Sequence, residues 1–136
     1  MSPVPETPRD LAVASFGDGR YASVAGEARS GDWAVVLALT NEEPYLVPYE
    51  MVFRRDEGGW AEVAGNDSPG WRATGDAQGF VTVWGEAPGG ATRVTVRFRD
   101  AGQTVPVSAG HFLAVFWDVP ETDFDGDVPA EVSPAG

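Results

Sequence analysis

The stretch Thr92-Arg-Val-Thr-Val-Arg-Phe-Arg99 alternates strictly between apolar and polar side chains. Successive side chains of a β-strand point to opposite faces, so Val94, Val96 and Phe98 would share one face of such a strand. The threonines and arginines would then lie on the other face, in water. This pattern is typical of an antiparallel strand with one face on a core. The stretch therefore predicts a β-protein in which 92–99 forms a half-buried strand.

The same period of two recurs on both sides of this stretch. Its clearest instances group Trp33, Val35, Leu37 and Leu39 on one face, and Tyr49, Met51 and Phe53 on another. Residues 79–85 and 111–117 are apolar on both faces, which predicts central or covered strands. In all, seven or eight strands are expected, and the stretches identified are 21–28, 33–40, 49–55, 79–85, 92–99, 105–107 and 111–117.

Turn residues separate these strands at hairpin length. Glycine with aspartate or serine occurs at 30–32, 56–59, 100–102 and 108–110. No segment shows an apolar stripe at i, i+3 and i+4 with capping residues, so any helix is expected to be a single turn. The sequence therefore predicts an all-β fold, an antiparallel β-sandwich, with a small antiparallel β-barrel as the alternative.

The second half of the chain carries a family resemblance. Four short motifs follow one another: Val83-Trp-Gly-Glu-Ala-Pro88, Arg93-Val-Thr-Val-Arg97, Thr104-Val-Pro-Val107 and Gly110-His-Phe-Leu113. In this order they resemble the C-terminal hairpins of immunoglobulin-like β-domains in uncharacterised actinobacterial proteins, many of them extracytoplasmic. The resemblance implies an immunoglobulin-like sandwich and an actinobacterial source, but no activity and no functional residues. The absence of lysine and isoleucine is also typical of a GC-rich genome. With no cysteine, the chain lacks the Cys…Trp…Cys spacing of true immunoglobulin domains.

The length of 136 residues fits one domain. We expect a single β-domain over 11–120, an extended N-terminal segment over 1–10, and an acidic, flexible C-terminal tail over 121–136. The first ten residues contain three prolines and neither the basic nor the apolar region of a secretory signal. The expected location is therefore cytoplasmic if the chain is full length, and extracytoplasmic if it is a piece of a longer protein.

The acidic composition limits the possible partners. The formal net charge of −12 repels nucleic acid and anionic membranes, whereas it permits a basic protein partner. No apolar run approaches the roughly 20 residues that a membrane-spanning helix needs, so no membrane insertion is expected. The absence of cysteine excludes thiolate metal sites, and no cofactor is expected. The oligomeric state stays open.

Few residues suggest catalysis. His111 is the only histidine, and we expect it to be a turn-capping or surface residue. There is no Gly-x-Ser-x-Gly motif, and without lysine there is no Ser-x-x-Lys motif. An enzyme is therefore not the expected class. If the chain is an enzyme, the candidates are His111 and a carboxylate from another strand, Glu50 or Glu86.

The acidic tail contains one string that resembles a metal-binding loop. Asp123, Asp125 and Asp127 are spaced like the first ligands of a calcium loop. However, the sixth position is Val128 instead of glycine, and the twelfth is Pro134 instead of a bidentate glutamate. We therefore expect no metal here.

The five tryptophans supply the candidate binding residues. Trp33, Trp84 and Trp117 fall within strand patterns and are expected in the core, while Trp60 and Trp71 fall at turns. Exposed indoles on loops are common contact residues, although loop indoles also close the open ends of sandwiches. We therefore predict a non-enzymatic binding or protein-interaction module that uses Trp60 and Trp71. The alternative is a small β-barrel enzyme or carrier with an aromatic-lined pocket for a hydrophobic small molecule.

Overall fold

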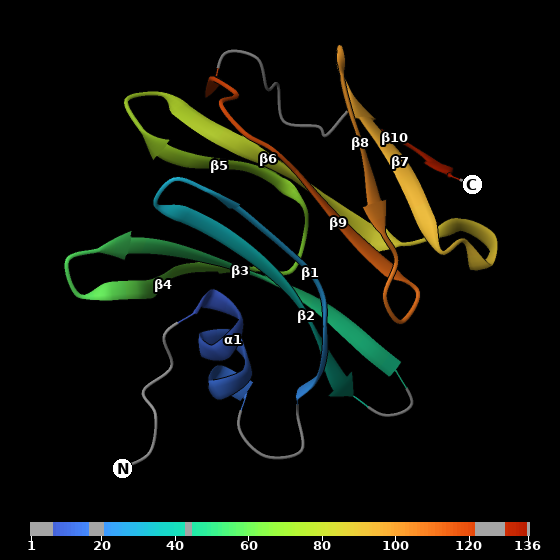
Figure 1. Ribbon diagram of the computed structural model, residues 1–136, viewed down its shortest axis with the longest axis horizontal. Coiled ribbons are helices and arrows are strands. Elements are labelled where there is room, and N and C mark those ends of the chain that lie inside the picture. The colour runs from blue at the N-terminus through green and yellow to red at the C-terminus, as the bar shows by residue number, and fades with distance from the viewer. Residues whose placement is uncertain (1–6, 17–20, 43–44, 122–129, 136) are drawn as a thin grey trace. The chain divides into compact units, whose positions relative to one another are not determined.

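The computed structural model describes residues 7–16, 21–42, 45–121 and 130–135 (Figure 1). Within these ranges the chain forms one α-helix, one short 3-10 helix and ten strands, and every strand pairing is antiparallel. The strands form three open sheets in the described part of the chain, and none of the sheets closes into a barrel. The all-β, antiparallel fold class is therefore confirmed, and the barrel alternative is wrong.

The chain divides into two compact units, Met1–Asp67 and Ser68–Gly136. The sequence predicts a single β-domain over 11–120, and this stays a prediction. The boundary lies within the Gly- and Pro-containing stretch 65–70, between two strands. Each unit has its own cluster of buried apolar residues.

The first unit is a four-stranded sheet accompanied by one helix. Its elements are α1 (Pro8–Phe16), β1 (Tyr21–Ser30), β2 (Trp33–Glu42), β3 (Tyr45–Asp56) and β4 (Gly59–Asn66). The strand order is β1-β2-β3-β4, so each strand pairs with the next one along the chain. Short turns make this order possible, and at the β1–β2 turn Gly31 has a φ of +57°, which glycine adopts at little cost.

Helix α1 is longer than the sequence predicts, and residues 8–10 belong to it instead of to an extended segment. Its start is explained by local chemistry. The Thr7 hydroxyl accepts a hydrogen bond of 3.1 Å from the Asp10 N–H. Pro8 lies at the first helical position, where an N–H would have no partner within the helix, so the N–H that proline lacks is not missed. Ala12 is fully buried and Leu11 packs beside it, which is too short a stripe to reveal a helix by periodicity.

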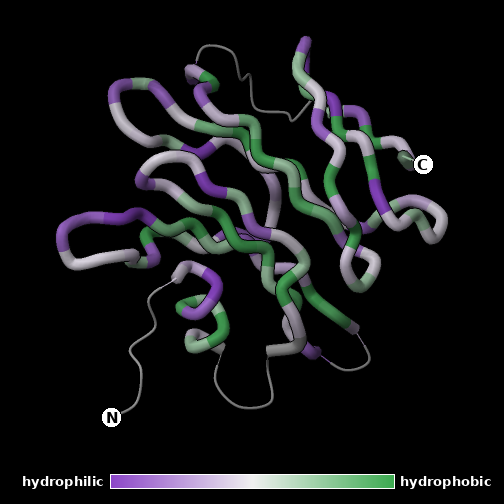
Figure 2. Tube along the Cα trace, in the orientation of Figure 1, coloured by the Kyte–Doolittle hydropathy of each residue, from purple (hydrophilic) through white to green (hydrophobic). Residues whose placement is uncertain are grey.

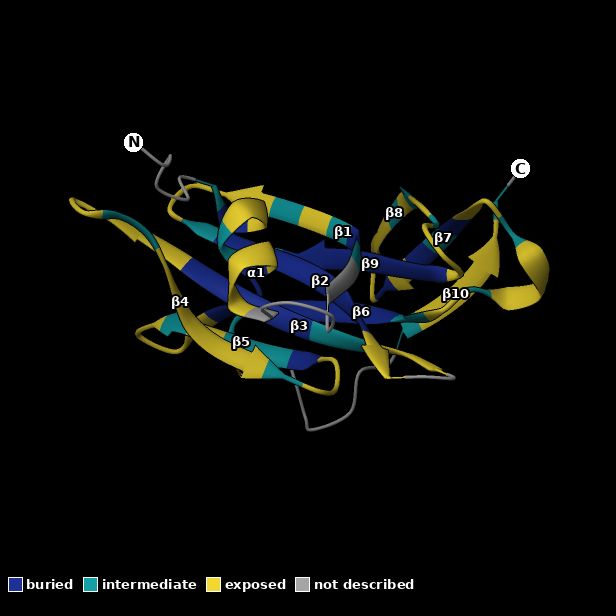
Figure 3. Cartoon of the chain, turned by 90° about the horizontal axis from the view of Figure 1, so that it is seen from below, coloured by how far each residue is buried: buried dark blue, intermediate teal, exposed yellow. Residues whose placement is uncertain are grey.

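The core of the first unit confirms the alternation predicted for 49–55. Met51 and Phe53 are buried and Tyr49 packs against them. The buried members of this cluster are Ala12, Val24, Ala34, Val36, Met51 and Phe53. Val35, Leu37 and Leu39 point to the opposite face of β2 and are also fully buried. Figure 3 accordingly shows most of β2 as buried.

The second unit is a β-sandwich of two three-stranded sheets. Its elements are β5 (Gly70–Gly75), β6 (Gln78–Glu86), the 3-10 helix η1 (Pro88–Gly90), β7 (Arg93–Phe98), β8 (Ala101–Pro106), β9 (His111–Phe116) and β10 (Ala130–Pro134). One sheet has the order β5-β6-β9 and the other the order β10-β7-β8. Both sheets contribute to one core of buried residues: Val81, Val83, Val94, Val96, Phe98, Phe112, Ala114, Phe116 and Val119.

The pattern of 92–99 is confirmed by this core. Val94 and Val96 are fully buried, whereas Arg93 and Arg97 are exposed. Strands β6 and β9 are buried on both faces, as their continuous apolar sequence predicts. Figure 2 shows the apolar residues along both of these strands.

The C-terminal residues are not all a flexible tail. Residues 130–134 form β10, which pairs with β7 so that Ala130 lies opposite Phe98 and Pro134 opposite Val94. The physical reason is that β7 would otherwise expose an edge, and the short apolar Ala130 and Val132 can cover it. Asp123, Asp125 and Asp127, where the spacing resembles a calcium loop but no metal is expected, lie outside the described residues. Among the residues that the structure describes, no helix is long and apolar enough to cross a membrane.

Candidate functional site

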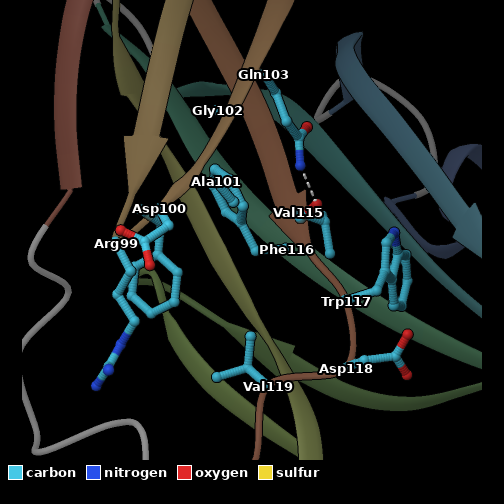
Figure 4. A pocket seen from close by; sticks show the side chains of 11 residues that line it. Arg99, Asp100, Ala101, Gly102, Gln103, Val115, Phe116, Trp117, Asp118 and Val119 are labelled. Atoms are coloured by element: carbon cyan, nitrogen blue, oxygen red, sulfur yellow. Dashed lines mark hydrogen bonds between the residues drawn. The ribbon is translucent and has the colours of Figure 1, made fainter.

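A pocket of about 480 Å³ lies at one end of the sandwich of the second unit (Figure 4). Two segments line it, residues 98–103 of the β7–β8 hairpin and residues 115–119 at the end of β9. The hairpin belongs to one sheet and β9 to the other, so the pocket opens where the two sheets of this unit separate. Its volume falls within the roughly 300–1,000 Å³ that is usual for small-molecule sites.

The rim of the pocket contains two residues with unusual backbone geometry. Arg99 has a φ of +56° and Asp118 a φ of +58°. A Cβ atom makes this left-handed region unfavourable by about 1–2 kcal/mol per residue. Arg99 is explained by the two-residue turn between Phe98 and Ala101, because such a hairpin turn requires positive φ. The sequence predicts the turn at 100–102, and the shift arises because β8 already begins at Ala101.

Aromatic side chains form the walls of the pocket. The rings of Phe98 and Phe116 lie 5.5 Å apart and are tilted by 43°. Trp117 packs against Phe80, with 4.8 Å between the ring centroids. Tilted ring pairs at these distances are favourable arrangements that hold side chains in place. The walls are therefore formed before any ligand binds.

Hydrogen bonds fix the position of the two segments. The Gln103 side-chain amide donates to the Val115 carbonyl, which joins β8 to β9 and hence one sheet to the other (Figure 4). The Val119 N–H donates to the Gly79 carbonyl at 2.9 Å. The Val119 carbonyl in turn accepts a hydrogen bond of 2.8 Å from Trp71 Nε1.

Charged groups lie at the mouth of the pocket. The carboxylates of Asp100 and Asp118 belong to exposed residues on opposite sides of it (Figure 4). The Arg99 guanidinium lies 5.8 Å from the centre of the Phe98 ring, within the range of a cation–π contact. Two carboxylates and one guanidinium give the mouth a negative balance.

Trp71, one of the two predicted binding residues, lies in β5 and not in a loop. Its ring packs half-buried against the core of the second unit, and its Nε1 is bonded to Val119. Trp71 therefore supports a residue that lines the pocket, while it does not line the pocket itself.

Trp60, the other predicted binding residue, lies in β4 of the first unit and packs half-buried against that core. The guanidinium groups of Arg29 and Arg55 lie 5.5 and 5.1 Å from its ring. Arg55 also donates two hydrogen bonds to the Asp32 carboxylate. The indole is thus partly covered by arginines, and it belongs to a different unit from Trp71.

No catalytic residue is expected, and His111 and Glu50, the candidates if the chain is an enzyme, belong to different units. His111 begins β9 and is buried, and its Nδ1–H donates a hydrogen bond of 3.0 Å to the Ala109 carbonyl. Glu50 in β3 is fully buried and accepts a hydrogen bond of 2.9 Å from the Asn66 amide. Glu86 was the other carboxylate considered as a partner of His111. The strand register places Glu86 directly opposite His111.

Sequence reasoning missed the residues of the pocket. Trp117 was expected in the core, and Asp118 was not among the candidate residues. The available signal was an aromatic strand end, 116–117, followed by a polar residue, together with a tight turn after Phe98. Neither signal shows that the two segments meet.

Comparisons of the chain with protein families, with curated proteins and with solved structures find no match. The assignment of a function therefore rests on the geometry of the two units.

Proposed function

We propose that the chain is a non-enzymatic binding module and that the pocket formed by 98–103 and 115–119 is its ligand site. The observation that carries the proposal is a pocket of about 480 Å³ with preformed aromatic walls. Its position also supports the proposal, because immunoglobulin-like sandwiches use the loops at one end for binding.

The walls favour a flat apolar group. Phe98, Phe116 and Trp117 are the aromatic residues of the lining, and Val115 and Val119 are its aliphatic residues. Burial of apolar area contributes about 25 cal/mol per Å², so one well-buried phenyl ring contributes about 2–3 kcal/mol. A ligand with a phenyl-sized group therefore suits the pocket.

The charges at the mouth favour a cation on that ligand. Asp100 and Asp118 place two carboxylates at the mouth, while the Arg99 guanidinium lies over Phe98. Because both aspartates are exposed, each contributes only about 0.2–1 kcal/mol. The net charge of −12 adds a long-range attraction for cations.

The chemistry of the lining supports binding over catalysis. Acid–base or nucleophilic catalysis uses a positioned imidazole, carboxylate, hydroxyl, thiol or amine. The residues that line this pocket offer carboxylates, one guanidinium and one amide, and both carboxylates lie at the exposed mouth.

Three small probes test the proposal: phenethyl alcohol, phenethylamine and phenylacetate. Their binding is measured by saturation-transfer NMR and calorimetry. We expect saturable binding of the first two, tightest for the amine, and the weakest binding for phenylacetate. Asp118→Asn should weaken binding of the amine by about 1.5–5-fold and leave binding of the alcohol unchanged.

A matched pair of variants locates the binding. Ala101→Phe places a ring in the pocket, whereas Thr104→Phe places the same ring on the outer face of the same strand, beside Thr95. We expect Ala101→Phe to abolish binding and Thr104→Phe to retain it. Equal binding by both variants, or no saturable binding by the unmodified chain, would contradict the proposal.

A further inference from the structure

Strand β8 of the second unit has one unpaired side. It pairs with β7, and among the described residues no strand pairs with its other side. Where this pairing ends, the Val107 N–H donates a hydrogen bond of 2.9 Å to the Thr92 carbonyl. Bonded and non-bonded pairs alternate between antiparallel strands, so the odd-numbered residues of β8 turn their backbone groups toward β7. The even-numbered Gly102 and Thr104 turn theirs away. We call residues 101–105 the open edge of β8.

The open edge is accessible. Gly102 and Thr104 are exposed, and among the residues that the structure describes neither backbone has a partner on this side. Figure 3 shows β8 as exposed and half-buried. An unpaired edge offers its N–H and C=O groups to a further strand. Pro106 occupies the next position whose N–H would point outward, so it ends the edge and leaves room for a short segment.

The open edge adjoins the proposed ligand pocket. Ala101, Gly102 and Gln103 belong to both. The Gln103 side chain donates to the Val115 carbonyl of the other sheet, so the odd-numbered side chains of β8 point into the gap between the two sheets (Figure 4). In an added strand, the residue opposite Ala101 would direct its side chain to the same face. That side chain would enter the pocket.

We propose that the ligand of this pocket is an aromatic side chain of a partner protein, carried by a basic extended segment that adds to the open edge of β8 as an antiparallel strand. The inference rests on the proposed ligand site and names the class of molecule that fills it. Backbone hydrogen bonds to Gly102 and Thr104 supply affinity, and the pocket selects the aromatic side chain.

The charges around the pocket select a basic segment. In the antiparallel register, the residue after the aromatic one lies beside Asp100, an exposed acid at the mouth of the pocket. Asp118 lies on the opposite side of the mouth. A lysine or arginine at that position is therefore attracted by both carboxylates. The net charge of −12 attracts a basic partner over a longer range, whereas two copies of this chain repel each other.

The test uses the peptide acetyl-Thr-Val-Thr-Phe-Lys-amide and measures its binding to the full chain by calorimetry. With its phenylalanine opposite Ala101, the third residue lies opposite Gly102 and the second opposite Gln103. The N–H of the third residue then points at β8, and the N–H of the second points away from it.

Two N-methylated peptides form a matched pair, because each lacks one N–H. We expect methylation of the third residue to weaken binding by about tenfold or more, since one hydrogen bond is lost and the methyl group clashes with the edge. Methylation of the second residue should weaken binding by less than about threefold. Equal losses would overturn the proposal.

Two further peptides test the side chains. Alanine in place of phenylalanine should weaken binding by about tenfold or more, because the pocket stays unfilled. Glutamate in place of lysine should weaken binding by about threefold or more, because an acid then meets the carboxylates at the mouth. Unchanged affinity of either peptide would contradict the proposed recognition of a basic aromatic segment.

Amide exchange tests the pairing itself. The peptide should slow exchange at Gly102 and Thr104, because new hydrogen bonds protect these amides, whereas phenethylamine should fill the pocket without protecting them. Peptide binding without this protection would overturn the inference. Saturable binding of phenethylamine without binding of the peptide would overturn the inference and leave the ligand site standing. Failure of both to bind would overturn the proposed function itself.

Discussion

Trp71 and Val119 are joined by a hydrogen bond of 2.8 Å from the indole Nε1 to the backbone carbonyl, although 48 residues separate them in the sequence. Val119 lines the candidate ligand pocket, and its own N–H donates to Gly79. Both the N–H and the carbonyl of Val119 are thus hydrogen-bonded, which fixes this part of the pocket wall. Trp71 acts as a positioning residue for this wall and is not an exposed contact residue.

Replacement of Trp71 by phenylalanine should therefore destabilise the second unit. The variant keeps a smaller ring on the core and removes the hydrogen bond to Val119 together with part of the buried ring area. We expect a loss of about 1–2 kcal/mol in the free energy of unfolding, since a part-buried carbonyl loses its partner. Thermal unfolding measures the effect, with Trp60→Phe as the control in the first unit. An unchanged melting temperature for Trp71→Phe would show that the bond contributes nothing.

Replacement by alanine should destabilise the second unit at one glycine and have little effect at another. At Gly79 a Cβ would lie 2.1 Å from the Arg72 carbonyl oxygen and 2.6 Å from the Trp71 ring. Because backbone blocks that position, Gly79→Ala should cost about 1–3 kcal/mol or more. At Gly102 the nearest atom, Arg97 Cγ, is 3.7 Å away, so Gly102→Ala should change stability by less than about 0.5 kcal/mol. Equal unfolding midpoints of the two variants in denaturant would contradict the close packing at Gly79.

Removal of β10 should destabilise the chain. Truncation after Pro129 deletes the strand that pairs with β7 and exposes that edge. We expect the melting temperature to fall by several degrees, whereas the sequence alone predicts a flexible tail over 121–136. Glu131→Gln, an exposed change on the same strand, serves as a control and should stay within about 0.5 kcal/mol. A truncated chain that melts at the original temperature would show that the pairing of β10 with β7 does not contribute to stability.

The Glu62 carboxyl should make stability depend on pH. Since its pKa is raised in the folded state by burial, the folded chain binds the extra proton more readily than the unfolded chain. The stabilisation of the folded chain by this proton is fully present below the unfolded-state pKa of Glu62, and it is lost as the pH rises through the folded-state pKa. Glu62→Gln should remove that fall and should be the more stable form at neutral pH, by no more than about 0.5 kcal/mol at so exposed a residue. Parallel pH profiles of the two proteins would contradict this.

Strand positions could be predicted from the sequence wherever alternation was strict. Val94, Val96 and Phe98 lie in the core as their pattern indicates, because a two-residue period is a local property of the chain. Strands β4, β5 and β10 were missed, since Gly59–Asn66 is largely exposed, Gly70–Gly75 begins and ends with glycine, and Ala130–Pro134 is short and polar. Helix α1 was missed because its signal lies in Thr7 and Pro8 and not in an apolar stripe.

The candidate site could not be predicted, because it depends on contacts between distant segments. Arg99 and Asp118 adopt positive φ at the rim of one pocket, but nothing local in the sequence brings their segments together. The predicted residues Trp60 and Trp71 were chosen for their turn-like surroundings, which describe neither their burial nor their partners. His111 and Glu50 were chosen by residue type alone, and the fold places them in different units.

Mapping of amide chemical shifts during a titration with phenethylamine tests the proposed ligand site on the intact chain. We expect saturable shifts concentrated in 98–103 and 115–119, with smaller changes at Trp71, whose indole holds Val119. The Ala101→Phe variant should lose these shifts at the same amine concentrations. Shifts that are linear in amine concentration, or that cluster away from these two segments, would contradict the proposal.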